Sequence, residues 1–239
     1  MEAREEILIK SGLNGTQLKM LAIICMVIDH AAWTFLPSEV YPISSGILHF
    51  IGRLTFPILC FFIGEGYRKS SNVPKYMLRL FILAVLSAVP FCMLFFNLCG
   101  YFLDTIFTLF FGLCALYLAG KTKNKFLKGV IVTFFMIISV VGDAGVSGVL
   151  LIYMFGTIDN KKKALIYGLT AINLVDLLLM FLISGSINID IIVSIIGVFA
   201  SYPLLMKYNE QRGKSIKYFF YIFYPLHIIV LLGAKMLIR

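Results

Sequence analysis

The stretch KMLAIICMVIDHAAWTF, residues 19–35, is the most informative part of the sequence. It is almost entirely apolar and, with Leu18, has about the 20 residues that a helix needs to cross a membrane. Yet it contains an acid and an imidazole, Asp29 and His30. A charged side chain inside a span costs about 2.5–3.5 kcal/mol or more, so such residues tend to be functional. The stretch therefore predicts a membrane helix that carries part of a site.

The whole chain has the composition of an integral membrane protein. Of its 239 residues, 60% are hydrophobic and 14% are charged. Soluble domains are nearer to 45–50% apolar and roughly 25% charged, so an ordinary soluble globule is excluded. The five cysteines lie in or beside apolar runs, are odd in number and form no C-x-x-C pair. We interpret them as packing thiols, and we expect neither a disulfide framework nor a metal site.

Hydropathy predicts an all-α bundle of about nine transmembrane helices. Their approximate ranges are 18–36, 47–67, 76–96, 101–120, 126–142, 144–158, 164–184, 189–206 and 218–237. The fifth and sixth are short and are separated only around Gly142, Asp143 and Gly145, so they could instead form one bent hairpin or a re-entrant pair. No repeat or separate soluble segment is evident, and residues 1–239 are interpreted as one integral-membrane domain.

The positions of the basic residues indicate which side of the membrane each connection lies on. The net charge of +9 could indicate a nucleic-acid partner, or it could be the excess of Lys and Arg typical of cytoplasmic loops. Basic and non-basic connections alternate through the whole chain. The basic groups are Arg4, Lys10 and Lys19; Arg68, Lys69, Lys75 and Arg79; Lys121, Lys123, Lys125 and Lys128; Lys161–Lys163; and Lys207, Arg212, Lys214 and Lys217. This pattern predicts a cytoplasmic N-terminal segment (1–17), an external C terminus, a lipid bilayer as partner and no nucleic acid.

Lys19 and His30 are expected on one face of the first span. They are 11 residues apart, which leaves them about 20° from full turns and roughly 16 Å apart along the axis. This face would offer a cation near the cytoplasm and an imidazole deep in the membrane. The alternatives are that Lys19 only reaches toward the headgroups and that Asp29 and His30 are a structural pair.

The second and last predicted spans carry the other buried polar side chains. His49 and Arg53 share a face of the second span, and Glu65 lies at its inner end. Arg53 needs a buried anion, such as Asp29 or a substrate group; a structural salt bridge for Arg53 and an interfacial position for His49 are the alternatives. His227 lies near the middle of the last span, beside a kink predicted at Pro225, and lines a cavity or bonds to the carbonyl that the proline frees.

No motif for nucleotide hydrolysis, a serine esterase or a zinc protease is present. A buried histidine beside an acid, with cations at the cytoplasmic mouth, suits acyl transfer across a membrane. Lys and Arg would hold the polyanionic acyl-CoA donor, and its long, thin arm would bring the thioester to a histidine base.

Several segments resemble the TraX family, and the likeness covers most of the chain. They are residues 11–19 (SGLNGTQLK), 26–30 (MVIDH), 52–53 with 56–57 (GR, FP), 65–66 (EG) and 224–227 (YPLH). TraX proteins are named for N-terminal acetylation of conjugative F-type pilin and are similar to a broader membrane acyltransferase family with an Arg-x10-His pattern. Here the pattern is Lys19-x10-His30, which keeps the charge but weakens bidentate phosphate recognition. The resemblance implies acetyl-CoA as donor, a bacterial cytoplasmic membrane, and a surface protein or envelope glycan as acceptor.

We therefore expect a membrane-embedded N- or O-acyltransferase. His30 would be the general base with Asp29 orienting it, although Asp29 could instead meet Arg53, and Arg53 or His227 would stabilise the oxyanion. The expected donor-phosphate residues are Lys19, Arg68, Lys69, Lys75 and Arg79. The rival hypotheses are a transporter or flippase with a buried His/Asp/Arg relay and a non-catalytic protein of surface-appendage assembly.

Overall fold

The protein is built from helices. The computed structural model describes residues 12–99, 103–186, 189–214 and 217–238, and this part of the chain contains helices and two isolated β-bridges. The helices are α2 (Gly15–Phe35), α3 (Pro42–Gly52), α4 (Thr55–Lys69), α5 (Val73–Cys99), α6 (Thr105–Gly120), α7 (Lys125–Ile138), the 3-10 turn η1 (Ser139–Val141), α8 (Gly145–Thr157), α9 (Lys161–Ser184), α10 (Ile189–Met206) and α11 (Lys217–Ile238).

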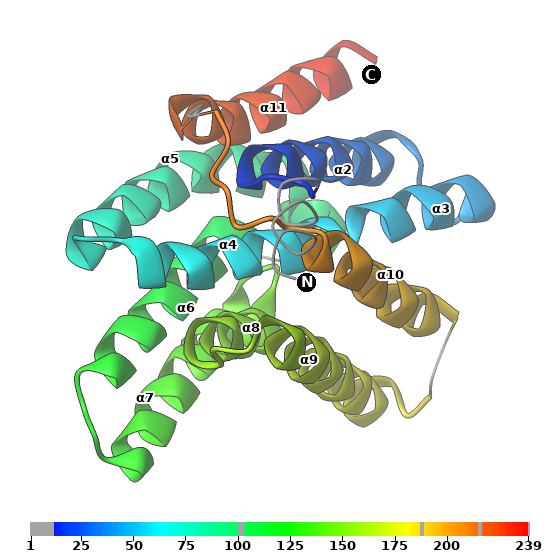
Figure 1. Ribbon diagram of the computed structural model, residues 1–239. Helices are drawn as coiled ribbons and strands as arrows, with labels where there is room; N and C mark the ends of the chain where they lie inside the picture. Colours follow the sequence, from blue (N-terminus) through cyan, green and yellow to red (C-terminus); the bar gives the residue numbers. More distant parts are fainter. Residues whose placement is uncertain (1–11, 100–102, 187–188, 215–216, 239) are drawn as a thin grey trace.

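Helix α4 lies at the centre of the bundle (Figure 1) and packs against α2, α6 and α8. Helices α2, α5 and α11 lie on one side of it, and α7 and α9 lie on the other. The tight contact between α4 and α8 depends on glycine, because a Cβ added at Gly64 would press on the backbone of Phe155 and Gly156. Small residues allow membrane helices to approach closely in the same way.

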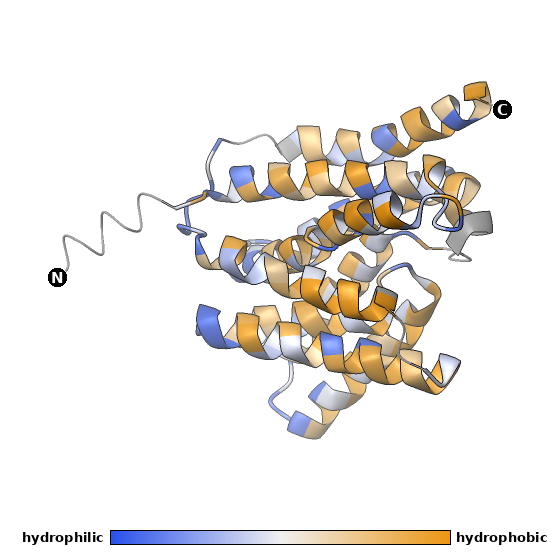
Figure 2. Ribbon diagram, turned by 90° about the vertical axis from the view of Figure 1, so that its right-hand side faces the viewer, coloured by the Kyte–Doolittle hydropathy of each residue, from blue (hydrophilic) through white to orange (hydrophobic). Residues whose placement is uncertain are grey.

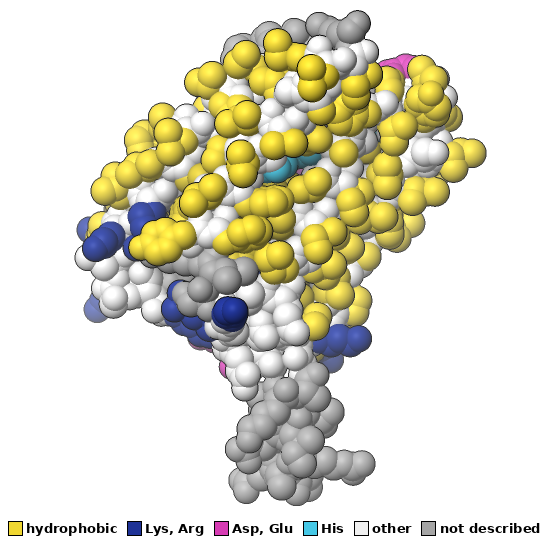
Figure 3. Space-filling model, turned by 90° about the horizontal axis from the view of Figure 1, so that it is seen from above, with side chains coloured by type: hydrophobic (Ala, Val, Ile, Leu, Met, Phe, Trp, Pro, Cys, Tyr) yellow, Lys and Arg dark blue, Asp and Glu magenta, His cyan; other side chains and the backbone are white. Residues whose placement is uncertain are grey.

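The basic residues gather at one end of the bundle, which we call the basic end. Hydrophilic residues mark the helix ends on the left of Figure 2, and Lys and Arg side chains surround the same end in Figure 3. Hydrogen bonds join segments that were predicted to share a side: Lys161 Nζ donates to the carbonyl of Tyr208 (3.0 Å) and Lys69 Nζ to that of Glu210 (3.3 Å). At the opposite end, Leu103 bridges to Gly142. These contacts fit the alternation in the sequence.

The surface between the two ends is apolar. Apolar side chains in the middle of long helices, such as Leu86 (63% exposed), Leu174 (60%) and Val230 (59%), point outward, and the face seen in Figure 3 is mostly hydrophobic. Apolar patches of this extent are not found on soluble monomers, whereas a bilayer covers them. The chain is therefore a multi-pass membrane protein.

Within the residues that the structure describes, five segments are long and apolar enough to cross a membrane, against the nine expected. They are Gly15–Phe35, Pro42–Lys69, Val73–Phe95, Lys161–Ser184 and Tyr218–Ile238. Helix α6, helix α8 and the apolar part of α10 (Ile191–Met206) are shorter than these five segments. Helices α7 and α8 have 14 and 13 residues, or about 21 and 20 Å, which is less than the roughly 30 Å hydrocarbon core. The count of nine and the location of the two termini stay predictions, and residues 1–11 of the expected N-terminal segment lie outside the described residues.

The second expected span corresponds to one apolar segment, Pro42–Lys69, but its start was placed too late and its helix is interrupted by a turn. Helix α3 begins at Pro42 and ends at Gly52, and α4 begins at Thr55 after a turn at Arg53 and Leu54. Pro57 explains the break, because a proline has no N–H and would clash with the carbonyl four residues earlier, at Arg53. The break places Arg53 at a helix junction rather than within a helix.

Candidate functional site

The segment that opens α2 holds the connection between α10 and α11. Leu13 N donates to the carbonyl of Lys207 (2.8 Å), and Asn209 N donates to that of Leu13 (3.0 Å). Gly12 is required there, since a Cβ would collide with the carbonyl oxygen of Lys207. Asn14 begins the helix as its N-cap, in a reciprocal capping box with Gln17. Residues 12–19 of the SGLNGTQLK segment are thus a structural clamp at the basic end.

Glu65 ties this clamp to α4. Its carboxylate accepts hydrogen bonds from the Tyr208 hydroxyl (2.7 and 2.9 Å) and from Lys69 Nζ (2.7 Å). Burial and these bonds to a carboxylate raise the pKa of the Tyr208 hydroxyl, which stays protonated as a donor. Glu65 therefore has a local structural role at the basic end, away from Arg53, which lies just before the first turn of α4.

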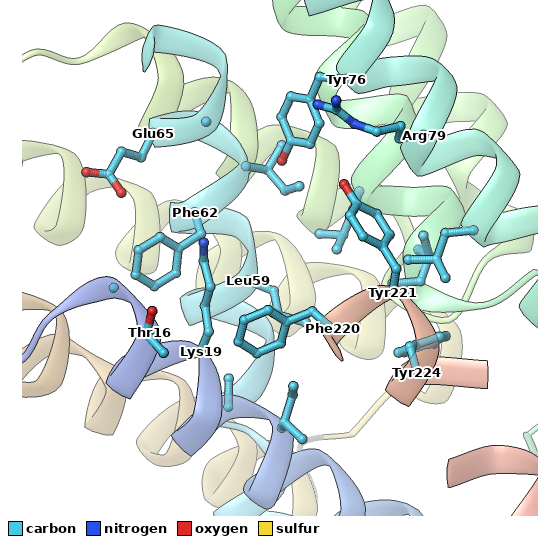
Figure 4. Close-up of a pocket in the computed structure, with 18 of the residues that line it drawn as sticks. Thr16, Lys19, Leu59, Phe62, Glu65, Tyr76, Arg79, Phe220, Tyr221 and Tyr224 are labelled. Atoms are coloured by element: carbon cyan, nitrogen blue, oxygen red, sulfur yellow. The ribbon is translucent and has the colours of Figure 1, made fainter. Parts of the chain in front are cut away.

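A cavity of about 530 Å³ opens between α2, α4, α5 and α11, and we call it the basic cavity. Figure 4 shows Lys19, Phe62, Tyr76, Arg79 and Tyr221 around it. The Lys19 ammonium lies 4.5 Å from the centre of the Phe62 ring. Arg79 Nε is buried without a hydrogen-bond partner among the described residues. A cationic, partly apolar cavity of this size suits an anionic ligand with a long organic arm.

The cavity includes three of the five residues expected to hold the donor. Lys19, Lys69 and Arg79 line it. Arg68 does not, because its guanidinium donates to the carbonyl of Phe155, and Lys75 is not among the lining residues either. Two cations were missed, Arg212 and Lys214, which sequence reasoning had treated only as loop charges. The clamp that brings them to α2 could not be read from hydropathy.

His30 and His227 form a buried pair between α2 and α11. His30 Nδ1 lies 2.9 Å from His227 Nε2, and His227 Nδ1 lies 3.2 Å from the carbonyl oxygen of Phe223. A carbonyl only accepts, so Nδ1 of His227 carries the proton and its Nε2 accepts from His30 when both rings are neutral. The remaining nitrogen of His30, Nε2, then has a free lone pair. This pairing assigns the tautomer that a general base requires.

The pair corrects two expectations. Asp29 does not orient His30, because its carboxylate pairs with His49 instead. The distance between His49 Nδ1 and Asp29 Oδ1 is 2.7 Å. His227 bonds to the carbonyl of Phe223 and not to the one that Pro225 leaves unpaired, which is that of Tyr221. With both of its nitrogens engaged, neutral His227 has no donor left for an oxyanion.

Gly52 makes room for the Asp29 side chain. A Cβ at this position would collide with the Asp29 carboxylate. We expect Gly52→Ala to destabilise the protein by about 1–3 kcal/mol, as overpacking does, and to lower its melting temperature in detergent. Gly46 is the matched control on the same helix, since an added Cβ there meets nothing within 4 Å. Gly46→Ala should leave the melting temperature unchanged or raise it, and an equal loss in both variants would contradict this account.

Arg53 lies near Asp29, as the sequence suggested, and near two further carboxylates that the sequence did not assign to it. It lines a second cavity, of about 620 Å³, with Asp29, Asp143 and Asp176, and it interacts electrostatically with the last two. Nothing in the local sequence pairs Asp143 or Asp176 with Arg53, although the position of Asp176 well inside a predicted span indicates a buried role. No group of three or more His, Cys, Asp or Glu within the described residues is arranged to hold a metal ion.

This second cavity also contains His30, and we call it the histidine cavity. It adjoins the basic cavity, because Met26, Thr55, Leu59 and Tyr224 line both. We call these four residues the shared wall. The two cavities therefore adjoin inside the bundle, with Lys19 and Arg79 lining one and His30 lining the other. The shared face of Lys19 and His30 on α2 spans this path.

Comparison with known proteins places the chain in a family. The family model described as "TraX protein" matches residues 14–235, nearly the whole chain. The chain belongs to the TraX family. One relative is "Probable fimbrial assembly protein FimC, serogroup H1" from Dichelobacter nodosus, which is 32% identical over 244 residues, covering 95% of this chain and 97% of the relative. No solved structure matches this TraX protein.

Proposed function

We propose that this TraX protein is a membrane-embedded acyltransferase that moves acetyl from acetyl-CoA, bound at the basic end, to an amine or hydroxyl of a surface protein or envelope glycan. The observation that carries the proposal is the pair of adjoining cavities, which link the cations of one to the histidine base of the other. The basic end is the cytoplasmic side in this proposal, as the excess of Lys and Arg predicts.

In the proposed mechanism, Lys19 and Arg79 hold donor phosphates and the acyl arm extends toward the shared wall. His30 Nε2 takes the proton from the acceptor as its nucleophile attacks the thioester. His227 accepts the hydrogen bond from His30 Nδ1, so it holds the ring in the productive tautomer and stabilises the imidazolium that forms. His227 is thus a positioning residue, by analogy with the third member of a catalytic triad.

A non-catalytic role in assembling a surface appendage is the second candidate, and the name of the Dichelobacter nodosus relative, a fimbrial assembly protein, favours it. Cells that carry either the wild-type protein or His30→Gln separate the two. Mass spectrometry of their surface proteins and glycans should find acetylated species only with the wild-type protein. If the appendage assembles normally with His30→Gln while the acetyl groups are lost, the function is catalytic; identical acetylation in both strains would contradict the proposal.

A further inference from the structure

The Tyr224 hydroxyl is a buried donor without a partner. The side chain is 5% exposed, and its hydroxyl oxygen makes no hydrogen bond to any described residue. Its ring packs edge-on against that of His227, with 5.4 Å between the centroids. The Thr105 hydroxyl interacts with that of Tyr224, but its own proton goes to Asp143 (2.6 Å), and the two hydroxyl groups lack hydrogen-bond geometry. An unsatisfied buried hydroxyl costs about 1–3 kcal/mol, so its retention calls for an explanation.

The position of Tyr224 supplies that explanation. It is one of the four residues of the shared wall, where the basic and histidine cavities meet. Met26 and Leu59 have no donor, and the Thr55 hydroxyl gives its proton to the carbonyl of Ala22 (3.0 Å). Tyr224 therefore contributes the one side-chain donor of this wall that is not already engaged. The two cavities adjoin at this side chain, so a ligand that reaches from one to the other lies against Tyr224.

We propose that the Tyr224 hydroxyl binds the thioester carbonyl oxygen of the acyl donor and stabilises the oxyanion formed on it; this inference rests on the proposed function. The acceptor nucleophile forms a bond to the carbonyl carbon, and the carbonyl electron pair moves to the oxygen that Tyr224 contacts. The acceptor proton moves to His30 Nε2. When the intermediate collapses, the carbon–sulfur bond breaks and the thiolate leaves and takes a proton from His30. Neutral His227 cannot be this donor, because both of its ring nitrogens are already engaged in hydrogen bonds.

Tyr224→Phe tests the inference because it removes only the hydroxyl. In purified protein we expect kcat to fall by about 10²–10³-fold, the loss typical of an oxyanion donor, with little change in the KM for acetyl-CoA. The melting temperature should hold or rise, since no hydrogen bond is lost. Tyr153→Phe on α8 is the matched control: this tyrosine packs against the core and lines neither cavity. It should keep the wild-type rate.

A binding measurement separates this inference from the proposed function. S-ethyl-CoA has no thioester carbonyl, so the wild-type protein should bind acetyl-CoA more tightly than S-ethyl-CoA, and Tyr224→Phe should lose the preference. That pattern in a protein that transfers no acetyl would support the Tyr224 contact and overturn the transferase. Normal transfer and an unchanged preference in Tyr224→Phe would overturn the contact alone. Absence of any acetyl-CoA binding to the wild-type protein would overturn both.

Discussion

Replacing His30 with glutamine is expected to slow acetyl transfer by about 10²–10⁴-fold, the range that a positioned general base contributes. Glutamine can still donate a hydrogen bond to His227, so the buried contact between α2 and α11 is kept. It has no basic nitrogen, so it cannot take the proton from the acceptor nucleophile. The measurement is kcat for label transfer from acetyl-CoA, together with the melting temperature, which should change little.

The other two histidines supply the matched comparison for His30. His227→Gln should have a smaller effect, because it alters the orientation of the base but leaves the base itself. His49→Gln should have the smallest effect, because this side chain pairs with Asp29 and has no hydrogen bond to His30. This order of effects is specific to the account. If His49→Gln were the most damaging variant, the base would have to be assigned to the Asp29–His49 pair.

Neutralising the basic cavity should weaken donor binding without affecting the chemical step. We expect Lys19→Gln and Arg79→Gln each to raise the KM for acetyl-CoA by about 10- to 150-fold, since a hydrogen bond to a charged group contributes roughly 1.5–3 kcal/mol. The value of kcat at saturating donor should stay near that of the wild type, because these residues contact the phosphates and not the reacting atoms. Initial rates over a range of acetyl-CoA concentrations give both constants.

Lys75 provides the matched control for these cations. It carries the same charge as Lys19 and lies at the same end of the bundle, but it is exposed and outside the lining of the basic cavity. Lys75→Gln should therefore leave the KM for acetyl-CoA unchanged. An equal rise in KM in all three variants would show that donor binding depends only on the general positive charge of the basic end. It would contradict the assignment of the basic cavity as the donor site.

The sequence predicted what depends on local patterning. Apolar runs gave most helices to within a few residues, and the spacing of Lys19 and His30 placed them along one path, since a helix fixes such relations by its geometry. The alternation of basic loops gave the arrangement of helix ends. The broken second span was missed although its cause, Pro57, is local, because hydropathy averages over such breaks.

The pairing of distant residues could not be predicted in the same way. His30 and His227 are 197 positions apart, and nothing in their local sequence shows that α2 and α11 pack together. Asp29 had two plausible partners, and the structure gives it a third, His49. Arg68 and Arg79 look equivalent in a list of loop charges, but one bonds to a backbone carbonyl and the other lines the basic cavity. Tertiary packing decides each of these.

The central claim is that the adjoining cavities carry acetyl from the basic end to His30. Its most direct test is a proteoliposome assay with uniformly oriented protein, labelled acetyl-CoA on one side, and a surface-protein and glycan fraction on the other. The account predicts label on the acceptor only when the donor is supplied at the basic end, and almost none with His30→Gln. Equal transfer with donor on either side, or full transfer by His30→Gln, would contradict it.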